Sequence, residues 1–446
     1  MVRTRFAPSP TGFLHIGSLR TALYAYALAK RENGVFVLRI EDTDQKREVE
    51  GSVDALKKTL EKFGLFWDEY FVQSDRLGLY KSAAQKLLSE GHAFYCQCDP
   101  KNAKEKGYSS ELRDPCRDKN YTSGAVKLLV PENKLLSYYD FVHKKEISWK
   151  TDTVYDATLL KSDGFPTYHL AVAVDDLDMK ITHILRGHDW MPSTPIHLLV
   201  FEYLGGQRPE IGHLTDILSS DTGKKLSKRR DSVFVEQFID EGYLPEALLN
   251  FVMLLGWAPK DNREIYSLTE FTQAFDVHGF QEANPKFLRN KLDWMNGQYM
   301  QKLTVEDMGS KISDFFKGKF DKNTVATIVP LIQTRIKTLK NFEEIAGFFF
   351  DKPRVDTNLL SENYASHLSD ALETFKNIDK WELENINEKL NQLIESKAYK
   401  TGEFFMNLRI AITGKKFTPP INESIEVIGK KETIERLSNV LSQNEK

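Results

Sequence analysis

Two segments of the chain combine residue types that could bind and activate a nucleotide. The first, PSPTGFLHIGS at residues 8–18, holds two prolines, two glycines and His15. Gly17 and Ser18 stand where a helix is expected to begin, and the free N–H groups of a helix N-terminus bind anions. His15 could donate a hydrogen bond to charge that develops on a phosphate. For such a segment taken alone, the alternative is a tight turn with a surface histidine.

The second segment is rich in cations. DTGKKLSKRRD, residues 221–231, contains five lysines and arginines among small, flexible residues, and Lys225 and Lys228 are two of them. Mobile positive charge can stabilise a triphosphate in its transition state and then release pyrophosphate. The alternative is a solvated basic turn, which is what most charge runs are.

The surrounding pattern predicts elements that would bring these segments to one edge of a sheet. Strands are predicted at residues 2–7, 34–41 and 181–186, with helices at 17–32, 48–64, 79–90 and 193–203. Alternating strands and helices predict a parallel sheet with right-handed crossovers. Ligands bind outside the carboxyl ends of such strands, where residues 8–18 lie.

The rest of the chain divides into an insertion and a helical half. Within the insertion, strands are predicted at residues 125–130, 145–150, 154–161 and 167–176, the last with the sequence TYHLAVAVDD. After Tyr243 the pattern is almost wholly helical, with helices expected at residues 325–339, 341–350 and 386–397. We therefore expect a Rossmann-like α/β domain at residues 1–95 and 181–242, a mixed α+β insertion at 96–180, and all-α domains at 243–305 and 306–446.

Composition narrows the class of protein. The 446 residues, 41% of them hydrophobic, are enough for a large core spread over several domains. The net charge of −3 gives no overall basic signature, although local clusters can still bind phosphate. No apolar run approaches the roughly 20 residues of a membrane span, and the first residues lack the pattern of a secretory signal. Three cysteines, an odd number, favour a reducing compartment. We expect a cytoplasmic protein with no membrane partner.

All three cysteines fall within one short stretch of the insertion. Cys96, Cys98 and Cys116 are compatible with zinc, which prefers thiolates in tetrahedral sites. Asp118 or Tyr108 could supply the fourth ligand. The role of such a zinc would be structural, because nothing in the segment supplies a metal-activated water. Three unrelated buried thiols are the alternative.

Together, the two nucleotide segments resemble the signatures of the class I aminoacyl-tRNA synthetases. HIGS at residues 15–18 is similar to the HIGH motif of that family, and KLSKR at 225–229 is similar to its KMSKS loop. RFAPSPTGFLHIG and LRIEDTD resemble the glutamyl and glutaminyl branch. SDGFPTYHLAVAVDD, ILRGHDW, STPIH and KLDWMNGQY resemble bacterial glutamyl enzymes. Ser18, Leu226 and Arg229 depart from the two motifs, but His15 and Lys228 are retained.

The resemblance implies an activity. A member of this branch joins L-glutamate to tRNA(Glu) through a glutamyl-adenylate, using ATP as substrate and Mg²⁺ on its phosphates. Some bacterial members also charge tRNA(Gln). The resemblance further implies a monomer whose helical C-terminal half binds the anticodon, with Arg335 in a helix that approaches it. Zinc near the tRNA acceptor end is present in some relatives and lost in others.

The resemblance also assigns the site residues. It implies that Arg5 binds the side-chain carboxylate of glutamate, that Glu41 binds its ammonium group, and that Arg186 helps to hold it. Tyr168, Ala7 and Ser9 would line the same pocket. The expected ATP-binding residues are His15, Gly17, Ser18, Asp189 and Lys228, and the expected catalytic residues are His15, Gly17, Lys225 and Lys228. Val172 stands where many relatives have asparagine, and an apolar residue there could alter the polar contacts around the amino acid.

Four other functions compete with this interpretation. A glutamyl-queuosine tRNA(Asp) synthetase shares the catalytic half but lacks a C-terminal part of this size. A glutaminyl enzyme usually carries β-barrels where this sequence is helical. A non-tRNA adenylyltransferase would be far shorter. An inactive RNA-binding paralogue is disfavoured by the intact His15, Glu41, Arg186 and Lys228.

Overall fold

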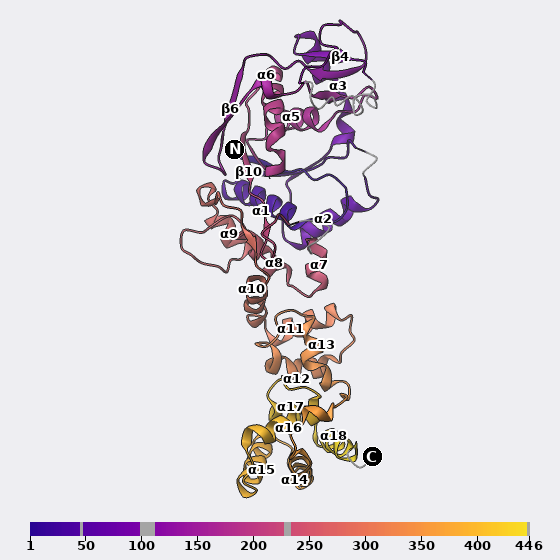
Figure 1. Cartoon of the computed structure of the whole chain (residues 1–446), viewed down its shortest axis with the longest axis vertical. Coiled ribbons are helices and arrows are strands. Elements are labelled where there is room, and N and C mark those ends of the chain that lie inside the picture. The colour runs from indigo at the N-terminus through magenta and orange to yellow at the C-terminus, as the bar shows by residue number, and fades with distance from the viewer. Residues whose placement is uncertain (45–47, 99–111, 227–232, 444–446) are drawn as a thin grey trace. The chain divides into compact units, whose positions relative to one another are not determined.

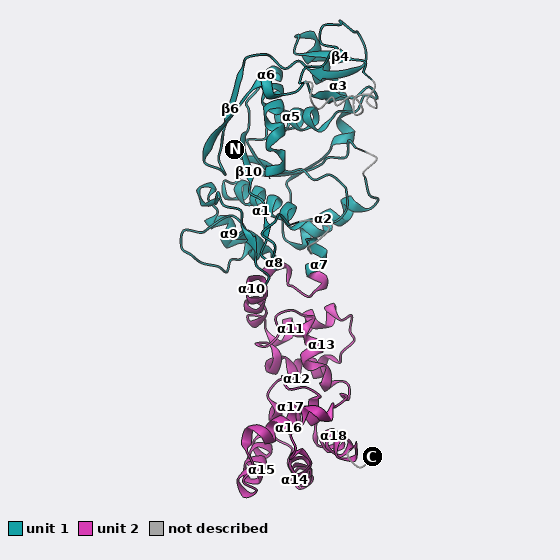
Figure 2. Ribbon diagram, viewed as in Figure 1, with its two compact units in different colours: residues 1–238, 248–289 teal, residues 239–247, 290–446 magenta. Residues whose placement is uncertain are grey.

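The computed structural model of the chain describes residues 1–44, 48–98, 112–226 and 233–443 (Figure 1). Two residues assigned above, Tyr108 and Lys228, lie outside these ranges. The chain divides into two compact units, drawn in teal and magenta in Figure 2. Unit 1 is Met1–Phe238 with Leu248–Arg289, and unit 2 is Ile239–Ala247 with Asn290–Lys446.

Unit 1 is built on parallel strands. The first sheet has the order β1-β2-β3, where β1 is Arg3–Phe6, β2 is Val35–Ile40 and β3 is Glu69–Val72, and both pairings are parallel. Helix α1 (Ile16–Arg31) joins β1 to β2, and α2 (Ser52–Lys62) joins β2 to β3. The parallel α/β fold predicted from the alternation of elements is confirmed.

A second sheet continues from the edge of the first. Its order is β7-β6-β10-β9, with β6 at Leu135–Asp140, β7 at Lys145–Lys150, β9 at His183–Gly187 and β10 at Glu210–Leu214. Strands β6, β10 and β9 run parallel, while β7 is antiparallel to β6. Thr182 N donates to Arg3 O at 2.9 Å, so the chain just before β9 lies along β1. The carboxyl ends of β1, β2 and β9 therefore share one edge.

The strand predicted for residues 167–176 is wrong, because these residues begin helix α5 (Tyr168–Asp178). Every residue from Leu170 to Asp176 is buried, so the helix has no polar face in this stretch to reveal its period. A short apolar run fits a buried strand and a buried helix equally well. Helix α5 packs against α3 (Leu77–Ser89) and α6 (Thr194–Leu204).

The insertion carries a small antiparallel sheet of order β4-β5-β8, formed by Ala93–Cys96, Ala125–Leu128 and Thr158–Leu160. The other strands and helices that the structure describes before residue 289 are short. They are β11 (Leu218–Ser219), β12 (Lys286–Phe287), α7 (Val235–Asp240), α8 (Pro245–Met253) and α9 (Leu268–Ala274). Among the residues of unit 1 that the structure describes, the 3₁₀ segments are Gln73–Arg76, Thr151–Thr153, His188–Ser193 and Val277–Gly279.

Unit 2 is helical, as predicted. Its helices are α10 (Arg289–Gln301), α11 (Val305–Phe315), α12 (Lys322–Ile332), α13 (Asn341–Ala346), α14 (Tyr364–Lys376), α15 (Leu383–Ser396), α16 (Thr401–Thr413), α17 (Ile421–Ile428) and α18 (Lys430–Ser442). Short 3₁₀ turns at Gly347–Phe349 and Thr357–Leu359 lie between α13 and α14. Helix α12 ends seven residues before the predicted residue 339. Among the described residues, no helix combines the length and apolarity needed to span a membrane.

Candidate active site

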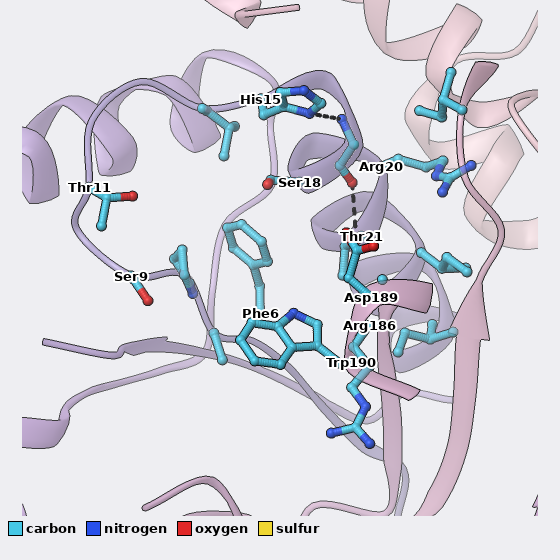
Figure 3. Close-up of a pocket in the computed structure, with 18 of the residues that line it drawn as sticks. Phe6, Ser9, Thr11, His15, Ser18, Arg20, Thr21, Arg186, Asp189 and Trp190 are labelled. Carbon is cyan, nitrogen blue, oxygen red and sulfur yellow. Dashed lines mark hydrogen bonds between the residues drawn. The ribbon is translucent and has the colours of Figure 1, made fainter. Parts of the chain in front are cut away.

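A cavity of about 390 Å³ opens at the shared strand edge of unit 1. The structure brings into its lining every assigned substrate and nucleotide residue that it describes: Arg5, Ala7, Ser9, His15, Gly17, Ser18, Glu41, Tyr168, Arg186, Asp189 and Lys225. Figure 3 shows His15 and Ser18 at the start of α1, across the cavity from Arg186 and Trp190. Val172, by contrast, is buried and is not among the lining residues.

The first loop forms the N-terminus of α1 at the wall of this cavity. His15 is the N-cap, and its Nδ1 accepts a hydrogen bond from the N–H of Gly17 at 3.0 Å (Figure 3). A ring nitrogen that accepts carries no proton, so the imidazole proton is on Nε2. Gly12 has φ of +120°, a backbone conformation that glycine adopts readily. The loop therefore presents a helix N-terminus to the cavity, together with an imidazole whose Nε2–H can donate.

Lys225 lies at the edge of the cavity on a short hairpin. Its backbone bridges to Leu218, and Leu226 N donates to Ile217 O at 2.9 Å. The Lys225 ammonium pairs with the carboxylates of Asp189 and Asp216, with an Nζ to Asp216 Oδ1 distance of 2.9 Å. Burial opposes the charge of Lys225, but the two carboxylates outweigh it and raise the pKa of the lysine. The structure thus holds one cation of the KLSKR segment beside the cavity.

Two strand residues, the residue that follows β2 and one helix residue form a buried charge cluster at the cavity. Asp176 of α5 accepts from Arg5 Nε at 3.0 Å and from Arg39 Nη1 at 2.7 Å, and Arg39 Nη2 donates to Glu41 Oε1 at 3.2 Å. Burial opposes ionisation of Asp176, but the two guanidinium groups hold its pKa below the usual value. The cluster fixes Arg5 on β1 beside Glu41, which directly follows β2.

The pKa of Glu41 shifts in the opposite direction to that of Asp176. Burial raises its pKa to about 7, against the opposing attraction of Arg39 and Arg5. A carboxyl group that titrates near neutral pH and faces a cavity is the kind of group found in binding and catalytic sites. Because Glu41 lines the cavity, its carboxylate can accept a cationic group there.

Arg39 and Asp176 were not identified from the sequence. Both are almost fully enclosed, with exposed fractions of 0%. The sequence contains a partial signal for these two residues. A charged residue within VFVLRI and an acidic pair at the end of LAVAVDD are unusual in apolar runs. What joins them is the packing of α5 against the sheet, which the expected strand at 167–176 would not produce.

The cysteines form a second cluster in the insertion. Ligand atoms of Cys96, Cys98, Asp114 and Cys116 all lie within 4.8 Å of one another. The Cys98 and Cys116 sulfurs are 3.5 Å apart, and Cys96 Sγ lies 3.4 Å from Asp114 Oδ2. Sulfurs around a tetrahedral zinc stand about 3.8 Å apart, so this donor set fits the metal. The carboxylate in the cluster is that of buried Asp114, while Asp118, the residue named from the sequence, is exposed.

Comparisons with known proteins agree with this geometry. Residues 1–294 match the family model "tRNA synthetases class I (E and Q), catalytic domain", and residues 295–441 match "Anticodon binding domain". The chain is 35% identical to a glutamate–tRNA ligase of Alkaliphilus metalliredigens, covering 98% of each protein. It is 36% identical to one of Clostridium tetani, covering 98% of this chain and 96% of that protein.

Solved structures give the same result. A glutamate tRNA ligase from Elizabethkingia meningosepticum, in complex with its amino acid, superposes with a TM-score of 0.89 at 31% identity. The one from Elizabethkingia anophelis superposes with a TM-score of 0.88, also at 31% identity. Both alignments cover 99% of each chain. The chain therefore belongs to the class I tRNA synthetases of the glutamate and glutamine branch, and within them to the family of glutamate–tRNA ligases.

Proposed function

We propose that this protein attaches L-glutamate to tRNA(Glu) in two steps at the cavity of unit 1. The observation that carries the proposal is the convergence of two arginines, one carboxylate, a helix N-terminus and a lysine in one cavity, provided by Arg5, Arg186, Glu41, the start of α1 and Lys225. These groups match the two carboxylates and one ammonium of glutamate and the phosphates of ATP.

The glutamate end of the cavity is built from charges of both signs. Arg5 and Arg186 bind carboxylate, because guanidinium groups pair with planar oxyanions, and Glu41 binds the ammonium group. Tyr168, Ala7 and Ser9 complete the walls. The ring of Tyr168 lies 4.1 Å from that of Trp190 between centroids, so the aromatic pair closes one side of this end.

The nucleotide end is built from the first loop and the lysine hairpin. The N–H group of Ser18 and the Nε2–H of His15 are the proposed donors for phosphate oxygens, while the N–H of Gly17 holds the His15 ring through Nδ1. Lys225 and Asp189 lie at the same end, and Lys228, outside the described residues, is proposed to reach the phosphates as well. Mg²⁺, bound to the phosphates of ATP, would neutralise part of their charge.

The reaction needs no covalent intermediate on the protein. The α-carboxylate of glutamate attacks the α-phosphorus of ATP, the bond to the β-phosphate oxygen breaks, and pyrophosphate leaves. The terminal ribose hydroxyl of tRNA then attacks the carbonyl of glutamyl-adenylate, and AMP leaves. The protein contributes alignment of the reactants and stabilisation of charge on the phosphate by His15, the α1 N-terminus and lysine.

Unit 2 supplies a surface suited to RNA. Arg335 is exposed, and burial, together with the charge of Arg335, lowers the pKa of Arg409. Arg409 donates to Thr418 O at 3.2 Å, next to Phe417, whose side chain is 88% exposed. Clustered cations beside an exposed ring are typical of surfaces that bind unpaired nucleotides. We propose residues 306–446 as the anticodon-binding part and 243–305 as a stem-contact part.

Three further features belong to the proposal. Zn²⁺ held by Cys96, Cys98, Cys116 and Asp114 would support the insertion structurally. The active form is proposed to be a monomer, as the family resemblance implies. A role in charging tRNA for translation supports the cytoplasmic location expected from the sequence.

Pyrophosphate exchange tests the first step. Labelled pyrophosphate should enter ATP when the enzyme is given glutamate and tRNA(Glu), and glutamine or aspartate should not replace glutamate. The resemblance further predicts that exchange requires the tRNA. Exchange driven by glutamine, or no exchange with any of the three amino acids, would contradict the proposal.

A further inference from the structure

Arg186 is a buried cation surrounded by neutral groups. Its side chain is 5% exposed, and its nitrogens donate to His213 Nε2 at 3.0 Å, His197 Nδ1 at 2.9 Å, Thr194 Oγ1 at 2.8 Å and Tyr168 Oη at 3.4 Å. Among the described residues, no carboxylate forms an ion pair with it. Arg5 and Arg39 differ, since both pair directly with Asp176.

An acidic residue contacts Arg186 indirectly, through an imidazole. Asp140 on β6, His213 on β10 and Arg186 on β9 stand in a row across three neighbouring parallel strands, as the pairings of Asp140 with Ile211 and of Arg186 with His213 show. His213 Nδ1 lies 2.7 Å from Asp140 Oδ2, and its Nε2 lies 3.0 Å from Arg186 Nε. Asp140 and His213 are both 0% exposed.

The contacts fix the tautomer of His213. A guanidinium can only donate, so the Nε2 that faces Arg186 must be without a proton, and the single proton must be on Nδ1, where Asp140 accepts it. Burial lowers the pKa of His213 to about 4, so the ring is neutral at physiological pH. Asp140 is ionised, because its bonds to His213 and to the backbone outweigh its burial and lower its pKa.

Asp140 is itself held rigidly. Its Oδ1 accepts from the N–H groups of Val142 and His143, each at 3.0 Å, and its Oδ2 accepts from Tyr138 Oη at 2.9 Å. The carboxylate therefore has little freedom to turn away from His213. Asp140 thereby fixes the neutral ring of His213, and the ring in turn fixes the guanidinium of Arg186.

We propose that Asp140, acting through His213, is a positioning residue for Arg186: it selects the imidazole tautomer that accepts from the guanidinium and so aims an unneutralised positive charge at a carboxylate of the substrate. A carboxylate touching Arg186 directly would compete with that substrate. A carboxylate one imidazole away orients the guanidinium and leaves one of its N–H groups, on Nη2, for the ligand. This inference rests on the proposed binding of glutamate in the cavity.

Asp140→Asn is the main test. An amide at position 140 can donate to Nδ1, which moves the imidazole proton to Nε2, opposite the Arg186 donor. We expect KM for glutamate in tRNA charging to rise about 10- to 100-fold, the range for loss of a hydrogen bond to a charged group. KM for ATP and kcat at saturating glutamate should change little. Tyr138→Phe is the matched control. Tyr138 Oη lies 2.9 Å from both Asp140 Oδ2 and His213 Nδ1, and its removal leaves Asp140 in place to accept the Nδ1 proton, so the tautomer should be unchanged.

Nitrogen-15 NMR of histidine-labelled protein reads the tautomer directly. In the wild type, His213 should carry its proton on Nδ1, and in Asp140→Asn it should carry it on Nε2. A wild-type proton on Nε2 would overturn the proposal, even if Asp140→Asn does not fold. So would a variant in which all KM values rise together while the tautomer is unchanged, because that would show a purely structural role.

His213 provides a second pair of variants. Gln has an oxygen that can accept from Arg186 and should keep KM for glutamate near the wild-type value, whereas Leu cannot accept and should raise it. Equal KM values for His213→Gln and His213→Leu would contradict the proposal. If the wild-type enzyme charges no tRNA with glutamate, it is the proposed function that fails, and the NMR result still decides the tautomer separately.

Discussion

Arg5 of β1 and Asp176 of α5 form an ion pair in the interior of unit 1, with Nε of the arginine 3.0 Å from Oδ1 of the aspartate. The same aspartate binds Arg39 of β2 at 2.7 Å. One carboxylate thus fixes two neighbouring strands to the helix that carries Tyr168. The substrate end of the cavity therefore depends on Asp176 and Arg39, two buried members of the cluster that do not line the cavity.

Asp176→Asn should destabilise the protein strongly. The substitution keeps the shape of the side chain but leaves two buried guanidinium groups short of one negative charge. Removing one partner of a buried pair costs about 3–5 kcal/mol of unfolding free energy. Urea denaturation followed by circular dichroism measures this loss. The exposed Asp178→Asn on the same helix is the control, and an equal midpoint for both variants would contradict the role given to Asp176.

Acid should weaken the capture of glutamate. Burial raises the pKa of Glu41 to about 7, so below that pH the group becomes a neutral acid that cannot pair with the ammonium of the substrate. We expect kcat/KM for glutamate to fall about tenfold per pH unit below this pKa, because kcat/KM reports groups of the free enzyme. Steady-state charging measured from about pH 5.5 to about pH 8.5 gives this pH profile. A profile in Glu41→Gln with the same acid limb would show that another group titrates.

Lys225→Met should slow the first chemical step. The lysine is held beside the nucleotide end by Asp189 and Asp216, and loss of one preorganised donor to a developing charge costs about 10²-fold or more in rate. Single-turnover formation of glutamyl-adenylate in the presence of tRNA measures it. Lys224→Met, one residue away and exposed, should behave as the wild type. Equal rates for the two variants would assign Lys225 a structural role only.

The purified protein should contain about one zinc ion per chain. Cys98→Ser should lose it, and Asp114→Asn should retain less of it, as measured by mass spectrometry of the metal content. Asp118→Asn is the matched control and should keep the metal, since Asp118 is exposed and Asp114 lies in the cluster. Loss of metal in Asp118→Asn but not in Asp114→Asn would contradict the assignment of the fourth ligand.

Local sequence was sufficient to predict the strand, the loop and the helix start that carry His15, Gly17 and Ser18. His15, Gly17 and Ser18 are adjacent in the chain, and the strand before them and the helix after them have clear patterns. The result was a correct parallel fold, with all described assigned residues of the substrate and nucleotide sites in one cavity.

Contacts between distant segments were not predictable in the same way. The pairing of Asp176 with Arg5 and Arg39 spans 171 and 137 residues and needs a helix where an apolar run favoured a strand. The row of Asp140, His213 and Arg186 depends on the register of three strands, which no single segment encodes. Which of Asp114 and Asp118 lies beside the cysteines depends on how the chain folds around Cys116, and the sequence pattern does not reveal this.

The most direct measurement is charging with labelled glutamate, run in parallel on tRNA(Glu), tRNA(Gln) and tRNA(Asp) transcripts. We expect ATP-dependent attachment of glutamate to tRNA(Glu), with tRNA(Gln) showing whether a second acceptor is used. Attachment to tRNA(Asp) alone, or to none of the three, would contradict the central claim that the cavity of unit 1 activates glutamate for tRNA(Glu).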